Sequence, residues 1–165
     1  MATRRQAREW ALQMLFQLDH NPAENIEKAF EDFWRQQLVN QNEDRENRDE
    51  VAPAASADPK DDLASARLRA FTERLVRGVV ANREALDKRL GDYLKNWPMH
   101  RLGGVERNVM RLAFYELFFE TETPPVVCIN EAVDLAKYFS NADAGRFVNG
   151  VLDRAAKDAN RPARK

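Results

Sequence analysis

Apolar residues recur every three or four positions along most of the chain, which places them on one face of an α-helix. The first such stripe follows Thr3. Because Thr3 and Gln6 have the spacing of a capping box, we expect a helix to begin directly after Thr3. Its apolar positions are Ala7, Trp10, Ala11, Met14, Leu15 and Leu18. Asn21 and Pro22 suit the N-cap and first position of a second helix, whose stripe consists of Ile26, Ala29, Phe30, Phe33, Trp34 and Leu38.

Five further helical stripes follow, most of them separated by glycine or proline. They lie within residues 68–80, 86–97, 105–117, 129–139 and 147–155. Asn82 suits the N-cap of the second of these, and Pro98 ends it, because the residue before a proline is pushed out of the α region. No run alternates with a period of two over five or more residues, so we predict no strand. The pattern predicts an all-α fold, a single-domain bundle of about seven helices.

The helical pattern is absent between Asn40 and Lys60. This segment has two prolines and only one large aliphatic residue, Val51, so it cannot bury enough apolar surface to offset the entropy lost on ordering. We therefore predict a flexible acidic loop at about 40–61, inside one domain that spans residues 1–165. A linker between two domains is the alternative, but the roughly forty residues before it would form a poor core by themselves.

The composition is typical of a soluble protein and not of a membrane or exported protein. Hydrophobic residues make up 44% of the chain and charged residues 32%, enough for a core beneath a solvated surface. No stretch approaches the roughly 18 consecutive apolar residues of a membrane span, and the start, MATRR, lacks the apolar core of an export signal. We therefore expect a soluble, cytoplasmic protein that does not associate with membranes.

Cysteine and histidine, two residue types that bind metals, are sparse in the sequence. Cys128 is the only cysteine, so an internal disulfide and a thiolate metal cluster are excluded. It lies in an apolar stretch, which is typical of a small buried hydrophobe. His20 and His100 lie far apart without ligand spacing, so we expect no metal site.

The net charge of −1 conceals an uneven distribution. Residues 41–62 include eight acidic and three basic residues, which leaves the rest of the chain positive. Basic residues gather at the two ends, namely Arg4, Arg5, Arg8, Arg154, Lys157, Arg161, Arg164 and Lys165. Such clusters can bind a polyanion, although basic ends are more often simply solvated.

Motifs for catalysis are missing. The sequence has no G-x-S-x-G nucleophile turn, no G-x-x-x-x-G-K-[ST] phosphate loop and no H-E-x-x-H zinc motif.

Gly103-Gly104 can present backbone N–H groups to an anion, but a glycine pair is more often a turn. Glu116, Glu131 and Asp134 can form an acid pair, but solvated helix faces explain them more simply. Gly150 lies inside a helical stripe, where it indicates the close approach of another helix.

The arginine-rich start is the strongest remaining signal. Arg4 and Arg8 lie one turn apart on the same helix face, close to Arg5. Guanidinium groups there can contact phosphates or stack on unpaired bases. Phe16 lies outside the main stripe, where it can stack on a base, meet a protein partner or pack against a neighbouring helix. By themselves, the residues indicate a helical binding module, for which RNA is one candidate ligand.

Four segments carry a resemblance to a known family. They are RRQAREWALQMLFQLD (Arg4 to Asp19), GGVERNVMRLAFYEL (Gly103 to Leu117), INEAVDLAKYFS (Ile129 to Ser140) and RFVNGVLD (Arg146 to Asp153). In order and spacing they resemble the NusB family of transcription antitermination factors. The resemblance implies a seven-helix bundle without a cofactor or catalysis. It also implies binding of boxA-type single-stranded RNA in nascent rRNA transcripts together with NusE, a small-subunit ribosomal protein, as part of the RNA polymerase antitermination complex.

The resemblance also assigns site residues. The RNA-binding positions that it implies are Arg4, Arg5, Arg8, Tyr93, Arg111, Asp143, Arg146 and Phe147. Phe16 and Glu106 match positions at the NusE interface, and Phe16 replaces a usual tyrosine, which keeps the stacking face but removes a hydroxyl donor. Gln6 stands where some members have another arginine. The Asp143 carboxylate is expected to restrain affinity by repelling phosphate, and Phe147 also belongs to an apolar stripe, so core packing is an alternative for it.

Two other classes of function remain open. One is a helical protein-interaction adaptor or homodimer without specific RNA binding. The other is part of an enzyme, since a NusB-type fold also occurs as the N-terminal RNA-binding part of an rRNA cytosine methyltransferase. The sequence has no methyl-donor-binding Rossmann domain, so we expect no enzymatic activity.

Overall fold

The computed structural model describes residues 3–46, 59–95, 97–120 and 122–159. These ranges contain seven α-helices, one short 3₁₀ helix and no strand, so the predicted all-α fold is confirmed. In chain order the elements are α1 (Arg4–His20), α2 (Ile26–Glu46), α3 (Pro59–Ala81), α4 (Arg83–Gly91), η1 (Met99–Arg101), α5 (Gly104–Phe118), α6 (Pro125–Phe139) and α7 (Ala142–Asp158). Within the same ranges, no helix is both long and apolar enough to cross a bilayer.

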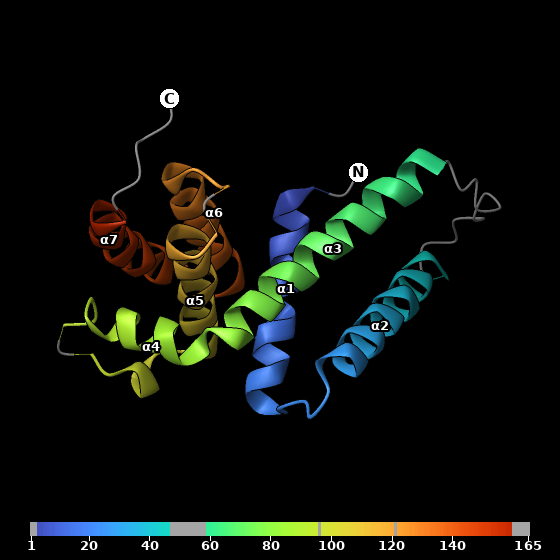
Figure 1. Cartoon of the computed structure of the whole chain (residues 1–165). Helices are drawn as coiled ribbons and strands as arrows, with labels where there is room; N and C mark the ends of the chain where they lie inside the picture. Colours follow the sequence, from blue (N-terminus) through green and yellow to red (C-terminus); the bar gives the residue numbers. More distant parts are fainter. Residues whose placement is uncertain (1–2, 47–58, 96, 121, 160–165) are drawn as a thin grey trace.

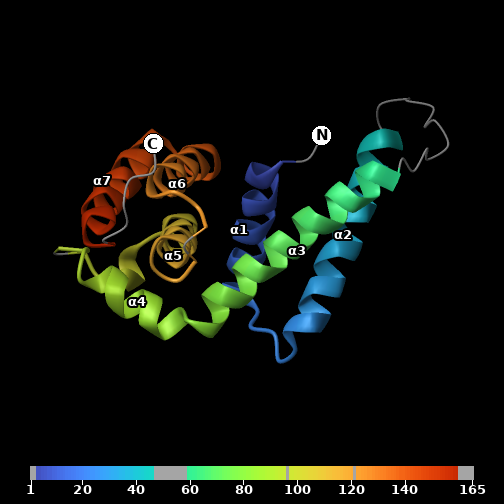
Figure 2. The same ribbon diagram turned by 45° about the horizontal axis from the view of Figure 1, so that its top comes forward.

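Helix α5 forms the centre of the bundle. It packs against α1, α3, α4, α6 and α7, and Figure 2 shows it nearly end-on with α4, α6 and α7 around it. Its buried apolar side chains are Val109, Met110, Leu112, Ala113, Phe114 and Leu117. Burial around most of the circumference is typical of a core helix, whereas the surrounding helices each bury one stripe.

Helix α2 lies at the edge of the molecule, beside α3 (Figure 1). Phe30, Phe33 and Trp34 on its inner face are buried. The indole of Trp34 packs perpendicular to that of Trp10 on α1, with ring centroids 5.3 Å apart. Its Nε1 donates a hydrogen bond of 2.9 Å to Glu73 Oε1 on α3. This aromatic cluster holds α2 against both neighbours.

The sequence predicted that Thr3 and Asn82 are the N-caps of two helices, and the structure confirms the cap only for Thr3. Thr3 is the N-cap of α1, and its Oγ1 accepts a hydrogen bond of 3.3 Å from the Gln6 amide, so the predicted start is confirmed. Asn82 precedes α4 as predicted, although its side chain donates back to a carbonyl of α3 instead of capping α4. The prediction that this helix continues to Trp97 is wrong, because it ends at Gly91, a residue type that lowers helix propensity by about 1 kcal/mol.

The predicted start of α2 is also wrong. The Asn21 amide donates a hydrogen bond of 2.9 Å to the Gln17 carbonyl, so Asn21 closes α1 and does not begin a helix with Pro22. Asn25 takes that role, since its Oδ1 accepts a hydrogen bond of 3.0 Å from the Glu27 amide at the start of α2. Residues 21–25 therefore form the connection between the two helices.

Both ends of the predicted acidic loop are helical. Helix α2 continues to Glu46 and α3 begins at Pro59, so the loop prediction is wrong for residues 40–46 and 59–61. These positions lack an apolar stripe. Gln41, Glu43, Arg45 and Glu46 are nevertheless good helix formers, and extending a helix that is already formed costs less than starting one. The remainder of the predicted loop, residues 47–58, lies outside the described residues.

Two glycines of α7 have different surroundings. A Cβ on Gly150 would meet no atom within 4 Å, so the predicted close approach of another helix is wrong there. At Gly145 the approach is real, because a Cβ would lie 2.5 Å from Cγ of Lys137 on α6. Gly145 therefore lets the end of α6 pack closely against the start of α7.

Candidate RNA-binding and partner surfaces

Arg4 lies in the first turn of α1 and is exposed. Its guanidinium lies over the ring of Phe71 on α3, 5.3 Å from the ring centroid, and no carboxylate among the side chains that the structure describes forms an ion pair with it. Such an exposed cation–π contact contributes only about 0.5–1 kcal/mol. Arg4 is therefore available to a phosphate group.

Arg5 is half-exposed, but its guanidinium is occupied. Its Nε and Nη2 donate to the Glu131 carboxylate at 3.1 and 3.3 Å, and Nη2 also donates to Asp134 Oδ2 at 2.6 Å. The hydrogen bond and charge of Glu131 raise the pKa of Arg5. The interpretation of Glu131 and Asp134 as merely solvated is therefore wrong, and a phosphate must compete with both of them for Arg5.

Arg8 is not a surface residue. It is only 3% exposed, and its Nη2 and Nε donate to the carboxylate of the equally buried Glu116 at 2.8 and 3.1 Å. Burial opposes the charge on Arg8, but the hydrogen bonds and charge of Glu116 outweigh it and raise the pKa of Arg8. The expectation that Arg8 faces RNA, and that Glu116 is solvated, is corrected. This pair joins α1 to α5.

Arg111 is also buried, at 4% exposure, which corrects its assignment to the RNA side. Its Nε and Nη2 donate to the Asp87 carboxylate at 2.7 and 2.9 Å, and its Nη1 donates to Asp19 Oδ1 at 3.2 Å. Burial raises the pKa of Asp19. The hydrogen bond from Asn108 and the charge of Arg111 lower this pKa by more than burial raises it, so the net pKa of Asp19 is lowered. This network fastens α1, α4 and α5 together.

Three other predicted RNA residues meet in one open pocket. Tyr93, Arg146 and Phe147 line a space of about 300 Å³ between α7 and the segment after α4. Lys95 and Trp97 complete its walls. The sequence did not indicate these two, because the apolar spacing placed Trp97 on the stripe of a helix that in the structure ends at Gly91. Trp97 is 48% exposed and Phe147 38%, so aromatic faces and cations share an accessible site.

The pocket is held by contacts of α7. Arg154 donates a hydrogen bond of 3.0 Å to the Tyr93 carbonyl. The Tyr93 hydroxyl is hydrogen-bonded to the Asp158 carboxylate, which raises the pKa of Tyr93. Asp143 is exposed in the first turn of α7 and forms an ion pair with Arg146. An acidic residue at that position suits the helix dipole, and it competes with phosphate for Arg146.

The two predicted partner residues lie on either side of one glycine pair. Phe16 of α1 is 38% exposed, and a Cβ on Gly104 would lie 2.8 Å from its ring. A Cβ on Gly103 would lie 2.2 Å from the Glu106 carboxylate, which also accepts a hydrogen bond of 2.7 Å from Ser140 Oγ. The absence of side chains in the turn therefore brings Phe16 and Glu106 onto one surface at the start of α5.

Residues 5–157 match the sequence model of a known family, described as the NusB family. This chain belongs to the NusB family. Its relatives include the transcription antitermination protein NusB of Methylacidiphilum infernorum, which is 31% identical over 163 residues, covering 99% of this chain and 96% of the relative. The resemblance seen in the four sequence segments is confirmed.

Solved structures of NusB proteins have the same fold. NusB of T. maritima superposes with a TM-score of 0.70 at 30% identity, covering 95% of this chain and 92% of that chain. A chain from the crystal structure of antitermination factors NusB and NusE in complex with dsRNA superposes with a TM-score of 0.67 at 27% identity. The match covers 94% of this chain and 96% of the other.

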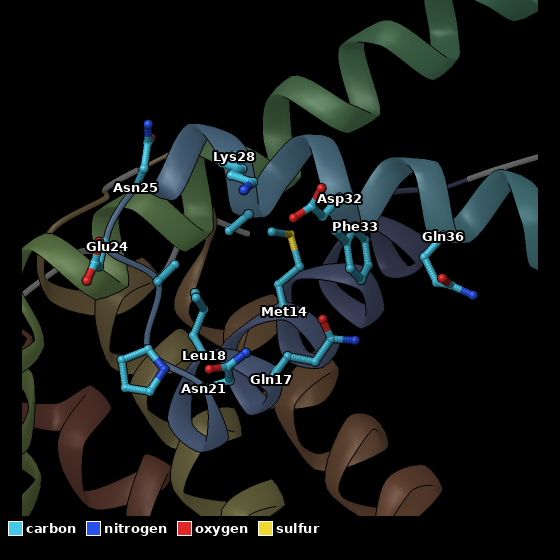
Figure 3. A pocket seen from close by; sticks show the side chains of 13 residues that line it. Met14, Gln17, Leu18, Asn21, Glu24, Asn25, Lys28, Asp32, Phe33 and Gln36 are labelled. Carbon is cyan, nitrogen blue, oxygen red and sulfur yellow. The ribbon is translucent and has the colours of Figure 1, made fainter.

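This NusB-family chain has a larger pocket away from those surfaces. It occupies about 590 Å³ between α1 and α2. Figure 3 shows Met14, Leu18 and Phe33 among its lining side chains, with the charged groups of Lys28 and Asp32 beside them. None of the predicted site residues lines it. No cluster of three potential metal ligands occurs in the described part of the chain.

Proposed function

We propose that this protein is a transcription antitermination factor that binds boxA-type RNA of nascent rRNA transcripts together with the ribosomal protein NusE. The complex supports processive rRNA transcription by RNA polymerase, in the cytoplasm and without catalysis by this chain. The observation that carries the proposal is the open pocket where Tyr93, Arg146 and Phe147 meet, in a chain that matches the NusB family over residues 5–157. A solved structure of similar fold contains NusB and NusE in complex with dsRNA.

On the RNA side, different groups bind phosphates and bases. Arg4 and Arg146 supply cations for phosphates, and Arg5 contributes when a phosphate displaces its carboxylate partners. Phe147 and Trp97 supply exposed aromatic faces, on which unpaired bases stack with about 1–3 kcal/mol per base. Single-stranded RNA fits this arrangement because its bases are free to leave the stack.

On the partner side, Phe16 and Glu106 form the contact with NusE. A partly exposed aromatic ring that packs against its own protein on one face is typical of the residues that dominate binding energy at interfaces. The Gly103-Gly104 turn adds no side chain of its own against the ring and the carboxylate, which contact His20 and Ser140 respectively. The charge of Glu106 favours a basic group on the partner.

The experiment measures boxA RNA binding by wild type and by the Arg4→Ala/Arg5→Ala double variant at several salt concentrations. We expect the double variant to bind at least about tenfold more weakly, with a salt slope shallower by about 0.7 for each phosphate that it no longer binds. Arg35→Ala is the matched control, since Arg35 is exposed and lies on α2, which carries none of the candidate RNA residues. Equal affinity and slope for wild type and the double variant contradict the assignment of these arginines.

One observation favours the alternative of a protein-interaction adaptor or homodimer. The carboxylate partners of Arg5 and Arg8 remove cationic surface from the start of α1. An adaptor with incidental basic ends binds boxA and scrambled RNA equally, in a salt-sensitive manner. A preference for boxA over the scrambled sequence distinguishes the antitermination factor from it.

A further inference from the structure

Tyr138 is the most exposed large apolar or aromatic residue in the described ranges, at 78%. It lies in the last turn of α6. Its ring contact within those ranges is with the adjacent Phe139, perpendicular at 4.9 Å between centroids. A single exposed aromatic residue needs no functional explanation by itself, so its neighbours decide what it does.

The neighbours of Tyr138 include a candidate RNA residue. Tyr138 lines a surface pocket of about 380 Å³ together with Arg5, Glu9, Asp134 and Lys137. Arg5 reaches this pocket from α1, where its guanidinium is held by the α6 carboxylates at 2.6 to 3.3 Å. The pocket therefore continues the arginine-rich start of α1 onto α6.

The same end of α6 is continuous with the second candidate RNA surface. The Lys137 side chain lies against Gly145 in the first turns of α7, where a Cβ would lie 2.5 Å from Lys137 Cγ. That part of α7 also carries Arg146 and Phe147 of the open pocket. Figures 1 and 2 both show α6 between α1 and α7. An RNA strand that contacts both surfaces can therefore cross this end of α6.

The charges around Tyr138 nearly balance. Arg5 and Lys137 are cationic, whereas Glu9, Glu131 and Asp134 are anionic. The attraction for phosphate is therefore weak here, and a contact that depends on charge is not favoured. Stacking of a base on an aromatic ring does not require net positive charge, because every base has a π-face.

We propose that Tyr138 is a base-stacking residue that connects the two RNA surfaces. An unpaired base of single-stranded RNA stacks on the phenol ring as the strand passes from Arg5 on α1 to the pocket on α7. This inference rests on the proposed RNA-binding function and adds to it a specific residue and a specific kind of contact.

The test compares Tyr138→Ala with Tyr138→Phe in titrations of a boxA-containing single-stranded RNA over a range of salt concentrations. We expect Tyr138→Ala to bind about 5- to 100-fold more weakly with an unchanged salt slope, because a phenol ring that stacks on a base neutralises no phosphate. Tyr138→Phe keeps the ring and retains wild-type affinity within about twofold. Val126→Ala is the control, because Val126 is 61% exposed at the other end of α6, about 18 Å away along the helix.

Each other outcome overturns the inference in a distinguishable way. If wild type binds boxA RNA and Tyr138→Ala binds equally well, Tyr138 does not stack and the proposed function stands. A shallower salt slope in Tyr138→Ala indicates that Tyr138 supports phosphate binding instead of stacking, and loss of NusE binding with RNA binding intact indicates that it faces the protein partner. If wild type itself does not bind RNA, the proposed function fails first. An unchanged melting temperature of Tyr138→Ala, expected from its exposure, excludes unfolding as the cause of weaker binding.

Discussion

Arg4, Arg5 and Arg8 lie within the first two turns of α1, but the fold gives each a different environment. Arg4 is exposed over the ring of Phe71. Arg5 is half-exposed and held by two carboxylates, and Arg8 is buried against Glu116. Of the three, Arg4 alone has no ion pair with a described carboxylate, so we expect it to be the most accessible to a phosphate. The cationic character of a residue therefore does not establish that it binds a polyanion.

Replacing Arg8 by alanine removes the guanidinium that balances the buried Glu116 carboxylate. We expect a loss of about 3–5 kcal/mol in the free energy of unfolding, since breaking one side of a buried ion pair is strongly destabilising. Denaturant titration followed by circular dichroism measures it. Arg4→Ala, one turn earlier and exposed, is the control, and we expect a change within about 0.5 kcal/mol. Equal stabilities of the two variants would show that Arg8 is not a buried ion pair.

The difference between Arg4 and Arg8 could not be predicted from local sequence. Periodicity indicates that the two lie on the same helix face, but it does not identify a partner 108 residues away in Glu116. The same limit applies to Arg111, whose partners Asp19 and Asp87 come from two other helices. By contrast, Tyr93, Arg146 and Phe147, three of the residues that the resemblance assigned to RNA, do line one pocket, and their contact with RNA stays a prediction.

Asp19 makes stability depend on pH. In the folded protein the pKa of Asp19 is lower than its ordinary value of 3.8. Burial raises this pKa, but the hydrogen bond from Asn108 and the charges of the neighbouring arginines lower it by more. A lowered folded pKa gives stability that is fully present above the unfolded value and is lost as the pH falls through the folded value. We therefore expect Asp19→Asn to destabilise the protein more at about pH 7 than at about pH 3, as measured by denaturant titration. An equal loss at both pH values would contradict a lowered pKa.

At the scale of elements, two glycines of α7 test how the helix packs. Gly150→Ala meets no neighbouring atom, so we expect it to raise the free energy of unfolding by about 0.5–1 kcal/mol, the propensity difference between the two residues. Gly145→Ala places a Cβ against the stem of Lys137, and we expect it to lower the free energy of unfolding relative to Gly150→Ala. Thermal and denaturant unfolding of both variants measure this. A similar gain for both would contradict the close approach of α6 to α7.

Helix number and helix faces could be predicted from the sequence, but several helix ends could not. The seven apolar stripes correspond to the seven α-helices of the described residues, because burial of a stripe drives the formation of each helix. Ends depend on which of several similar residues caps the chain, and Asn21 and Asn25 are equally suited by type. Only the folded chain shows that Asn21 closes α1 while Asn25 begins α2. Residues 40–46 extend α2 without any apolar pattern to indicate it.

At the scale of the whole molecule, buried ion pairs hold the helices together, while exposed residues form the proposed RNA and partner surfaces. Arg8 joins α1 to α5, and Arg111 joins α5 to α1 and α4. The partner surface of Phe16 and Glu106 lies at the start of α5, and Ser140 connects it to the end of α6. Because α6 also carries Tyr138, the proposed partner and RNA surfaces meet at the end of one helix. We therefore expect the binding of one ligand to influence the binding of the other.

The most direct test of the account is a pair of linked titrations with boxA RNA, scrambled RNA and NusE. We predict that wild type prefers boxA to the scrambled sequence and that NusE tightens boxA binding. Linkage requires boxA to tighten NusE binding by the same factor. Phe16→Ala should abolish this coupling while leaving boxA binding by the protein alone in place. Equal affinity for boxA and scrambled RNA, unaffected by NusE, would contradict the account.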